Sequence, residues 1–341
     1  MTKSTTQKLN SGQIFKSDFS QLKQLLCGNF VVVSQTVFDL YPSLFDNSIT
    51  LKTDGEGGKN LKGLSKIIDW FLSKNLSRDS LVFAVGGGAT LDLVGFACAV
   101  YMRGINWIAV PTTALSVADS GVGGKTAINF NNKKNILGSF HSPQKIILCN
   151  EFFVSLSKSQ IADGLAEIIK TALLDQDLLD TLDKIAYKDI DQIKADTLFD
   201  LAVKSAHVKE KIVLQDFFDK GKRQCLNMGH TIGHAIEAAY QLSHGQSVAI
   251  GLVLESQIYT KKNLYIKKWL KDKLNPILDF SKIKISDLDP QKIANLAMFD
   301  KKNSNEKITI MAIDDSKKIE KIQFLLDELS QSLEAVITIA N

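Results

Sequence analysis

The sequence has few cysteines and no long apolar run. Its four cysteines, Cys27, Cys98, Cys149 and Cys225, stand singly among apolar neighbours and form no C-x-x-C pair. This spacing gives no sign of a disulfide framework, so we expect four reduced residues of the core. No run of about 20 consecutive apolar residues occurs, and therefore no membrane-spanning helix is predicted.

Arginine is scarce, and charge of neither sign dominates. The 41 basic and 37 acidic residues give a net charge of +4 but are interleaved, so no basic stripe indicates nucleic acid as a partner. Only Arg78, Arg103 and Arg223 are arginines, so an arginine here can mark a need for a planar, bidentate donor. The N-terminal residues MTKSTTQKLNSGQ lack the apolar segment of a secretory signal, and we expect a cytoplasmic protein.

With 341 residues, 45% of them hydrophobic and 23% charged, the chain is long enough for two domains. Short apolar runs alternate with amphipathic stretches between about residues 29 and 150, as in 30–34 (FVVVS), 81–88 (LVFAVGGG) and 145–150 (KIILCN). This alternation predicts a mostly parallel sheet covered by helices. Beyond Glu151 the apolar residues recur every three or four positions, which predicts a mainly helical second half that begins between residues 150 and 160.

A run of three glycines follows the apolar segment at 81–85. Gly86, Gly87 and Gly88 open an apolar helix that contains Asp92, and the amides at such a helix start favour an anion. The dinucleotide pattern G-x-G-x-x-G is incomplete because Leu91 replaces its third glycine. The three glycines are therefore compatible both with a plain tight turn and with a nucleotide-binding turn.

The segment 119–126 (DSGVGGKT) ends like a phosphate loop. That motif requires glycine where Asp119 stands, and its carboxylate would repel a triphosphate, so a phosphate-loop nucleotidase is not predicted. What remains is a glycine turn that presents Lys125, followed by Lys133, Lys134 and Asn135. The alternative is a solvated hairpin with surface lysines.

Two further patterns lie on predicted helices. Glu167 and Lys170 are three residues apart, a spacing that is typical of a surface ion pair. His230 and His234 are four apart and share a helix face, with His244 ten residues further on. Two or three imidazoles and a carboxylate form an acceptable zinc set, although one histidine of the pair could instead bind substrate or phosphate, and both could be structural.

Together these motifs resemble those of the 3-dehydroquinate synthases, a family of sugar phosphate cyclases. The resemblance runs in family order over roughly residues 54 to 305, through GGGATLDLVGF, YMRGINWIAVPTTALSVADSGVGGKTAIN, KKNILGSFHSP, GLAEIIKTALL, HVKEKIV, RQCLNMGHTIGHAIEA, HGQSVAIG and FDKKN. It implies an α/β Rossmann-like nucleotide-binding domain (1–155) followed by a mainly α-helical metal- and substrate-binding domain (156–341). It also implies NAD, a divalent metal (Zn²⁺, with Co²⁺ as a substitute) and a homodimer. The implied reaction converts 3-deoxy-D-arabino-heptulosonate 7-phosphate to 3-dehydroquinate and phosphate in the shikimate pathway.

The resemblance assigns roles position by position. It implies the metal ligands Glu167, His230 and His244. The implied nucleotide contacts are Glu56, Lys59, Gly87, Gly88, Asp92, Thr112, Thr113, Leu115, Asp119, Lys125 and Lys134. The implied catalytic pocket is Asp119, Lys125, Asn135, Lys170, Lys209, Arg223, Asn227 and His234. Arg103 is expected to reach the neighbouring subunit's phosphate site, and either Lys301 or Lys302 to contact the phosphate.

The sequence departs from the family pattern at three places. Ser34 stands where an acidic or amide residue usually meets the adenosine ribose. Gln246 follows Gly245 where glutamate is usual. Residues 216–219 read DFFD where the family usually has an acidic pair. A metal-dependent polyol dehydrogenase, another cyclase of the superfamily and an inactive scaffold are the alternatives. Lys125, Asn135 and Lys209 favour dehydroquinate among the cyclase products, and the complete set of expected catalytic residue types argues against a scaffold.

Overall fold

The structure, a computed structural model, describes residues 12–131, 133–259, 264–281, 283–298 and 307–339. The chain divides into two compact units. Unit 1 comprises Met1–Leu156 and Lys209–Asp219, and unit 2 comprises Ser157–Val208 and Lys220–Asn341. The segment Lys209–Asp219 interrupts unit 2, a feature that a single boundary between residues 155 and 156 does not include.

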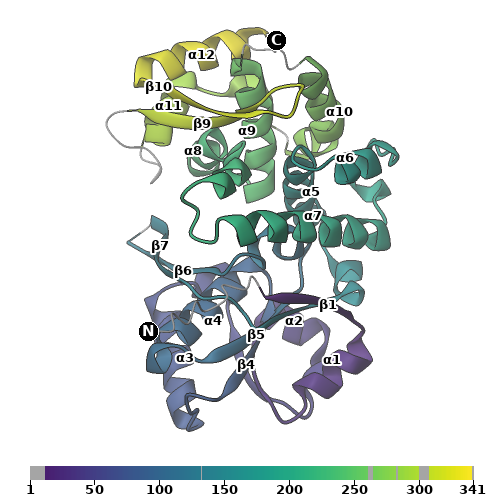
Figure 1. The fold of residues 1–341 in the computed structure, drawn as a ribbon, viewed down its shortest axis with the longest axis vertical. Coiled ribbons are helices and arrows are strands. Elements are labelled where there is room, and N and C mark those ends of the chain that lie inside the picture. The colour runs from purple at the N-terminus through teal and green to yellow at the C-terminus, as the bar shows by residue number, and fades with distance from the viewer. Residues whose placement is uncertain (1–11, 132, 260–263, 282, 299–306, 340–341) are drawn as a thin grey trace, which may run out of the picture. The chain divides into compact units, whose positions relative to one another are not determined.

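Unit 1 is built on a six-stranded sheet in which every paired strand runs parallel (Figure 1). In sheet order the strands are β1 (Gln13–Ser17), β8 (Lys145–Cys149), β5 (Asn106–Pro111), β4 (Leu81–Gly86), β2 (Phe30–Ser34) and β3 (Ile49–Thr53). The central strands are continuous apolar runs because helices cover both of their faces. Val31 to Val33 and Val82 to Val85 are accordingly buried.

The helices of unit 1 lie on the two faces of this sheet, as right-handed crossovers require. On one face are α1 (Phe19–Leu26) and α2 (Gln35–Leu40), and on the other are α3 (Leu61–Ser73) and α4 (Gly88–Val100) (Figure 1). The chain passes from β2 to β3 on one side and then to β4 on the other, so the sheet has a switch point between β2 and β4. Ligands of such sheets bind beyond the carboxyl ends of the strands at this point, where Ser34 and Gly86 end their strands.

A hairpin extends from unit 1. Strands β6 (Lys125–Phe130) and β7 (Lys133–Phe140) pair antiparallel, and every residue of β7 is exposed. This part of the chain is therefore an exposed hairpin, as one of the two interpretations of its sequence described it. Phe140 at its end packs on Phe217 and Phe218, with ring centroids 5.6 and 5.3 Å away, which helps to fix the segment Lys209–Asp219 in unit 1.

Unit 2 is mainly helical, with one two-stranded ribbon. Its helices are α5 (Lys158–Ala172), α6 (Gln176–Asp183), the part of α7 (Ala195–Gln215) that precedes Lys209, α8 (His230–Tyr240), α9 (His244–Ile258), α10 (Leu264–Ser281), α11 (Pro290–Met298) and α12 (Leu326–Ile339). The ribbon pairs β9 (Ile308–Ile313) with β10 (Ile319–Phe324) antiparallel and packs β9 on α8 and α9 (Figure 1). Shorter helical turns join the elements of both units: η1 (Pro42–Phe45), η2 (Gly55–Gly58), η3 (Tyr101–Arg103), η4 (Ser116–Ser120), η5 (Asn150–Ser155), η6 (Ile190–Gln192), η7 (Lys222–Asn227) and η8 (Ile285–Asp287).

Helix α9 lies at the centre of unit 2, buried along nearly its whole length. It packs against α8 so closely that glycine is required at the contact. A Cβ atom on Gly251 would lie 2.1 Å from the Gly229 carbonyl oxygen and 2.8 Å from the Gly233 nitrogen. The first turn of α8 thereby packs against the middle of α9. His230 and His244 are the first residues of these two helices, and their ring centroids lie 5.4 Å apart.

The structure confirms the fold class and corrects two details. Cys98, Cys149 and Cys225 are buried, but the prediction of a core position was wrong for Cys27, which is exposed where α1 ends. The ribbon β9–β10 was not expected in a helical half. Among the described residues, no helix is both long enough and apolar enough to span a membrane.

We predict that Gly251→Ala destabilises unit 2, since the added methyl group overlaps backbone atoms that cannot move aside. The free energy of unfolding, measured by urea denaturation, should fall by about 1–3 kcal/mol. Gly57→Ala is the control, because no atom lies within 4 Å of a Cβ at Gly57, and its change should stay below about 0.5 kcal/mol. Equal stability of the two variants would contradict the close α8–α9 contact.

Candidate metal and substrate sites

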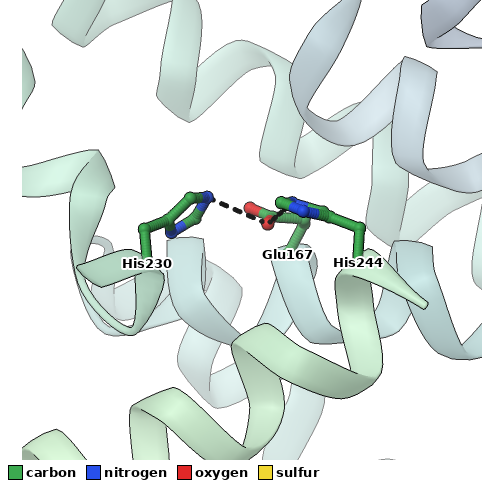
Figure 2. A group of neighbouring side chains, drawn as sticks. All are labelled: Glu167, His230 and His244. Carbon is green, nitrogen blue, oxygen red and sulfur yellow. Dashed lines mark hydrogen bonds and ion pairs between the residues drawn. The ribbon is translucent and has the colours of Figure 1, made fainter. Parts of the chain in front are cut away.

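Three side chains of unit 2 converge on one point. Glu167 comes from α5, and His230 and His244 begin α8 and α9; all three point toward one another in Figure 2. The Nε2 atoms of His244 and His230 lie 3.1 and 3.5 Å from the same Glu167 oxygen, Oε1. One ligand atom from each residue lies within 4.8 Å of the others, a spacing that suits one shared ion.

Local sequence explains why the two histidines occupy helix starts. The Ser243 hydroxyl oxygen caps α9 by accepting from the Gln246 amide, and Gln246 Oε1 accepts from the Ser243 amide, so the unusual glutamine after Gly245 completes a capping box. Asp163, one turn before Glu167 on α5, accepts hydrogen bonds from the Ser243 hydroxyl (2.5 Å) and the Gly245 amide (2.9 Å). The start of α9 is thereby tied to the helix that carries Glu167.

The carboxylate of Glu167 is completely buried and is paired with Lys170, whose side chain is 1% exposed. Burial alone would raise the pKa of Glu167, but Lys170 and His244 outweigh this effect and hold it well below the usual range. The pair is therefore not the surface ion pair of which this spacing is typical. The glutamate stays ionised, which is the form that binds a cation.

His244 lies between two carboxylates. Its Nε2 is 3.1 Å from Glu167 Oε1 and its Nδ1 is 3.3 Å from Glu237 Oε2. Burial lowers the pKa of His244, but the two carboxylates outweigh this effect and raise it to about 10. In neutral solution without metal, the ring therefore carries a proton on each nitrogen.

The remaining ring nitrogen of each histidine also has a suitable partner. His230 Nδ1 lies 3.0 Å from the Met228 carbonyl oxygen, so Nδ1 donates and Nε2 is left for a metal. When His244 loses its Nε2 proton, its Nδ1–H can still donate to Glu237. This arrangement of two imidazoles, one carboxylate and outer partners fits zinc with a fourth position left open.

A second group consists of His234, Glu237 and His244. One ligand atom from each of these residues also lies within 4.8 Å of the others. Since His244 belongs to both groups and His234 is exposed, the buried Glu167 group is the better enclosed of the two. The structure brings His234 to this site, with its ring centroid 5.2 Å from that of His230. Lys170 and His234 thus join the three candidate ligands at one place.

Unit 1 forms a separate polar cluster of its own at the ends of the central strands. Lys59 Nζ lies 2.6 Å from Asp92 Oδ2, and Lys209 Nζ lies 2.8 Å from Asp119 Oδ1. Burial raises the pKa of Asp92, and the Lys59 ammonium offsets this only in part. Asn129 links to this region by donating to Glu56 Oε1 at 2.8 Å and accepting from the Asn135 amide at 3.0 Å.

The glycine turn ends β4 and starts α4. A Cβ on Gly88 would lie 2.5 Å from the Ser120 hydroxyl oxygen, so the start of α4 lies directly against the Ser120 side chain. Thr112 follows the neighbouring strand and donates its amide to the Gly86 carbonyl at 3.1 Å. Ser34 ends β2 and caps α2 through the Val37 amide, which is the role the structure shows for this departure from the family pattern.

The predicted site residues divide between the units as follows. Unit 1 holds Glu56, Lys59, Gly87, Gly88, Asp92, Arg103, Thr112, Thr113, Leu115, Asp119, Lys125, Lys134, Asn135 and Lys209. Unit 2 holds Glu167, Lys170, Arg223, Asn227, His230, His234 and His244. Arg223 is 3% exposed within η7, which ends at Asn227, whereas Arg103 is exposed at the end of η3. Lys301 and Lys302 lie outside the described residues.

Several polar residues near these groups were not predicted from the sequence, among them Ser120, Asp163, Asp219, Glu237 and Glu255. Asp219 pairs with Lys125, which explains the last residue of the DFFD segment. Glu237 had a visible signal, since it lies three residues after His234 on the same helix. Ser120 and Glu255 reach their places through the fold and had no such signal.

Both units match models of the same protein family. Residues 49–163 match the family model described as 3-dehydroquinate synthase N-terminal, and residues 164–303 match 3-dehydroquinate synthase C-terminal. A 3-dehydroquinate synthase of Francisella tularensis subsp. tularensis (strain WY96-3418) is 34% identical over 339 residues, which covers 93% of each chain. A 3-dehydroquinate synthase of Clostridium kluyveri is 34% identical over 304 residues, 84% of each chain.

Solved structures share the fold at low identity. A 2-epi-5-epi-valiolone synthase from Streptomyces hygroscopicus subsp. jinggangensis 5008, with NAD+ and Zn2+ bound, has a TM-score of 0.85 at 20% identity and covers 97% of this chain and 98% of its own. A 2-deoxy-scyllo-inosose synthase complexed with carbaglucose-6-phosphate, NAD+ and Co2+ has a TM-score of 0.80 at 20% identity and covers 95% and 96%. A glycerol dehydrogenase from Schizosaccharomyces pombe has a TM-score of 0.64 at 18% identity and covers 97% and 90%.

We predict that a divalent metal displaces the proton held between His244 and Glu167. Because the pKa of His244 is raised to about 10, zinc affinity should rise with pH by about tenfold per unit for each proton released, and should fall as the pH is lowered. Calorimetric titration with zinc in buffers of different ionisation enthalpy measures the protons released.

The control is His207→Gln, which changes an exposed histidine of α7 and should leave the proton release unchanged. An affinity that does not change between pH 7 and pH 9, with no proton released, would contradict the protonated state of His244.

Proposed function

The chain belongs to the 3-dehydroquinate synthase family and is a sugar phosphate cyclase of the shikimate pathway; from this premise we propose how its own residues carry out the reaction. The substrate is 3-deoxy-D-arabino-heptulosonate 7-phosphate, and the products are 3-dehydroquinate and inorganic phosphate. The reaction is a phosphate elimination with ring closure, which makes the enzyme a carbon–oxygen lyase. The observation that carries the proposal is the buried group of Glu167, His230 and His244 beside Lys170.

Glu167, His230 and His244 would hold the divalent ion, with zinc proposed and cobalt as a substitute. The ion supplies a Lewis acid that lowers the pKa of a substrate hydroxyl. The chain's part is to keep the donor atoms ionised and oriented. Lys170 keeps Glu167 charged, Glu237 orients His244, and the Met228 carbonyl orients His230.

Unit 1 would bind NAD beyond the carboxyl ends of β2, β4 and β5. The nucleotide supplies reversible hydride storage, so that no net oxidation accompanies phosphate release. The amides at the start of α4, beside Gly87 and Gly88, suit the pyrophosphate. The Lys59–Asp92 pair, buried at the same end of the sheet, would fix a polar edge for the nucleotide.

The cations of the predicted pocket match a substrate that carries a phosphate and a carboxylate. Lys125, Lys170, Lys209 and Arg223 would balance the negative charge of these groups. Asp119, Asn135, Asn227 and His234 would accept from or donate to the hydroxyls and the phosphate. We extend the proposal to Lys301 or Lys302 as a phosphate contact, to Arg103 acting on a second subunit of a homodimer, and to a location in the cytoplasm.

The direct test incubates the purified chain with NAD, zinc and the seven-carbon substrate. We expect stoichiometric phosphate release and formation of 3-dehydroquinate, identified by mass spectrometry, without accumulation of reduced NAD. Steady reduction of NAD by the substrate or by glycerol would instead support a polyol dehydrogenase. A different carbocycle from another sugar phosphate would place the chain among the other cyclases.

We predict that Glu167→Gln weakens zinc binding by at least about 100-fold, or about 2.7 kcal/mol, because a neutral amide replaces the charged ligand. Chelator competition measures the affinity, and NAD binding, measured separately, should not change. The control is Thr171→Val, which alters the next turn of α5 and leaves the carboxylate in place. Full zinc occupancy and full activity in Glu167→Gln would remove Glu167 from the ligand set.

A further inference from the structure

The peptide group between Met228 and Gly229 is hydrogen-bonded at both of its ends. Its carbonyl oxygen, on Met228, lies 3.0 Å from His230 Nδ1. Its N–H, on Gly229, donates to Glu255 Oε2 at 2.7 Å. One planar amide therefore connects the carboxylate of Glu255 to the imidazole of His230.

Glu255 is well suited to hold this peptide in place. It comes from α9 and is 2% exposed, and its other oxygen, Oε1, accepts the Ile232 amide of α8 at 3.2 Å. Gly229 caps α8 but has no side chain that could satisfy the free amides of the first turn, so Glu255 supplies the cap from the neighbouring helix. The partial positive charge of the helix start favours a carboxylate there.

The backbone at this point has little freedom to rearrange. Gly229 lies in the left-handed region, with φ of 74°, and a Cβ on it would lie 2.6 Å from Leu252 Cγ. Thr231 donates its hydroxyl to the Thr309 carbonyl at 2.8 Å, a bond of the same helix turn that does not involve the Met228–Gly229 peptide. The orientation of the Met228 carbonyl is therefore set by the packing of α8 on α9.

An anion at the N–H of an amide increases the electron density on the carbonyl oxygen of the same amide, because hydrogen bonds in a chain polarise one another. A carbonyl with more electron density accepts a stronger hydrogen bond from His230 Nδ1–H. That bond fixes the ring and raises the basicity of Nε2, the atom that faces Glu167. His244 receives the equivalent support directly, from Glu237.

We propose that Glu255 is a positioning residue for the metal site, acting on His230 through the Met228–Gly229 peptide. The proposal rests on the proposed metal-binding function and deepens it. Glu255 is not one of the candidate ligands. Its effect is on the direction and basicity of one imidazole, and therefore on how tightly the ion is held.

The test is Glu255→Gln, which keeps the size of the side chain but removes its charge. Chelator competition should show zinc bound 10- to 100-fold more weakly than in the wild type, the usual effect of removing an outer partner of a ligand. In the zinc-loaded protein, the Nδ1–H proton resonance of His230 should move upfield because its hydrogen bond weakens, while that of His244 should stay in place.

Thr231→Val is the matched control, since it removes a buried hydrogen bond from the same helix turn without touching the peptide. It should lower stability while leaving zinc affinity and the His230 resonance unchanged. A purely structural role for Glu255 predicts that both variants behave alike, and that result would overturn the proposal. If Glu255→Gln does not fold, Glu255→Asp, which keeps the charge but shortens the reach, is measured in the same two ways, with the same losses expected.

The outcomes distinguish a failure of the proposed role of Glu255 from a failure of the proposed metal-binding function. If the wild type binds no zinc at Glu167, His230 and His244, the proposed function fails. If the wild type binds zinc tightly and Glu255→Gln and Glu255→Asp bind it equally well with the same His230 resonance, only the role of Glu255 fails.

Discussion

The site in unit 2 depends on one buried negative charge. Glu167 is fully enclosed, and an isolated carboxylate in such surroundings would be protonated or would destabilise the fold. Lys170, three residues along the same helix, and the protonated His244 supply the compensating positive charge. The low pKa of Glu167 and the high pKa of His244 have this common cause. A divalent cation would replace the proton on His244 without leaving the carboxylate uncompensated, so the same charges that stabilise the metal-free protein prepare it for the ion.

The geometry of the site follows from how helix starts are held. Both histidines are first residues of helices, and each of those starts is tied to a neighbouring helix by a buried or half-buried carboxylate. Asp163 on α5 binds the first turn of α9, and Glu255 on α9 binds the first turn of α8. The glycine contact at Gly251 lets α8 and α9 approach closely enough for these bonds to form. Three helices are thus linked in sequence around the ligand atoms, which gives a site whose positions are set by backbone packing.

Patterns within short windows of the sequence predicted most of the elements, because periodicity and glycine placement are local properties. The buried strands of unit 1, the mainly helical character of the second half and the His230–His234 face all follow from such patterns. The burial of Glu167 and Lys170 does not, since their spacing is the same in a surface pair and in a core pair. Glu255 lies 25 residues after His230, and only the packing of α9 on α8 brings it near. The assignment of Lys209–Asp219 to unit 1 likewise depends on distant contacts, those of Lys209 with Asp119 and of Phe217 and Phe218 with Phe140.

The central claim is that one divalent ion is held by a carboxylate of α5 and the first residues of α8 and α9. The most direct measurement is a crystal structure of the zinc-loaded protein with anomalous diffraction data collected on both sides of the zinc absorption edge. The account predicts one strong anomalous peak within about 2.0–2.2 Å of Glu167 Oε1, His230 Nε2 and His244 Nε2, with a further coordination position open. A peak bound instead by His234 and Glu237, or no peak near Glu167, would contradict it.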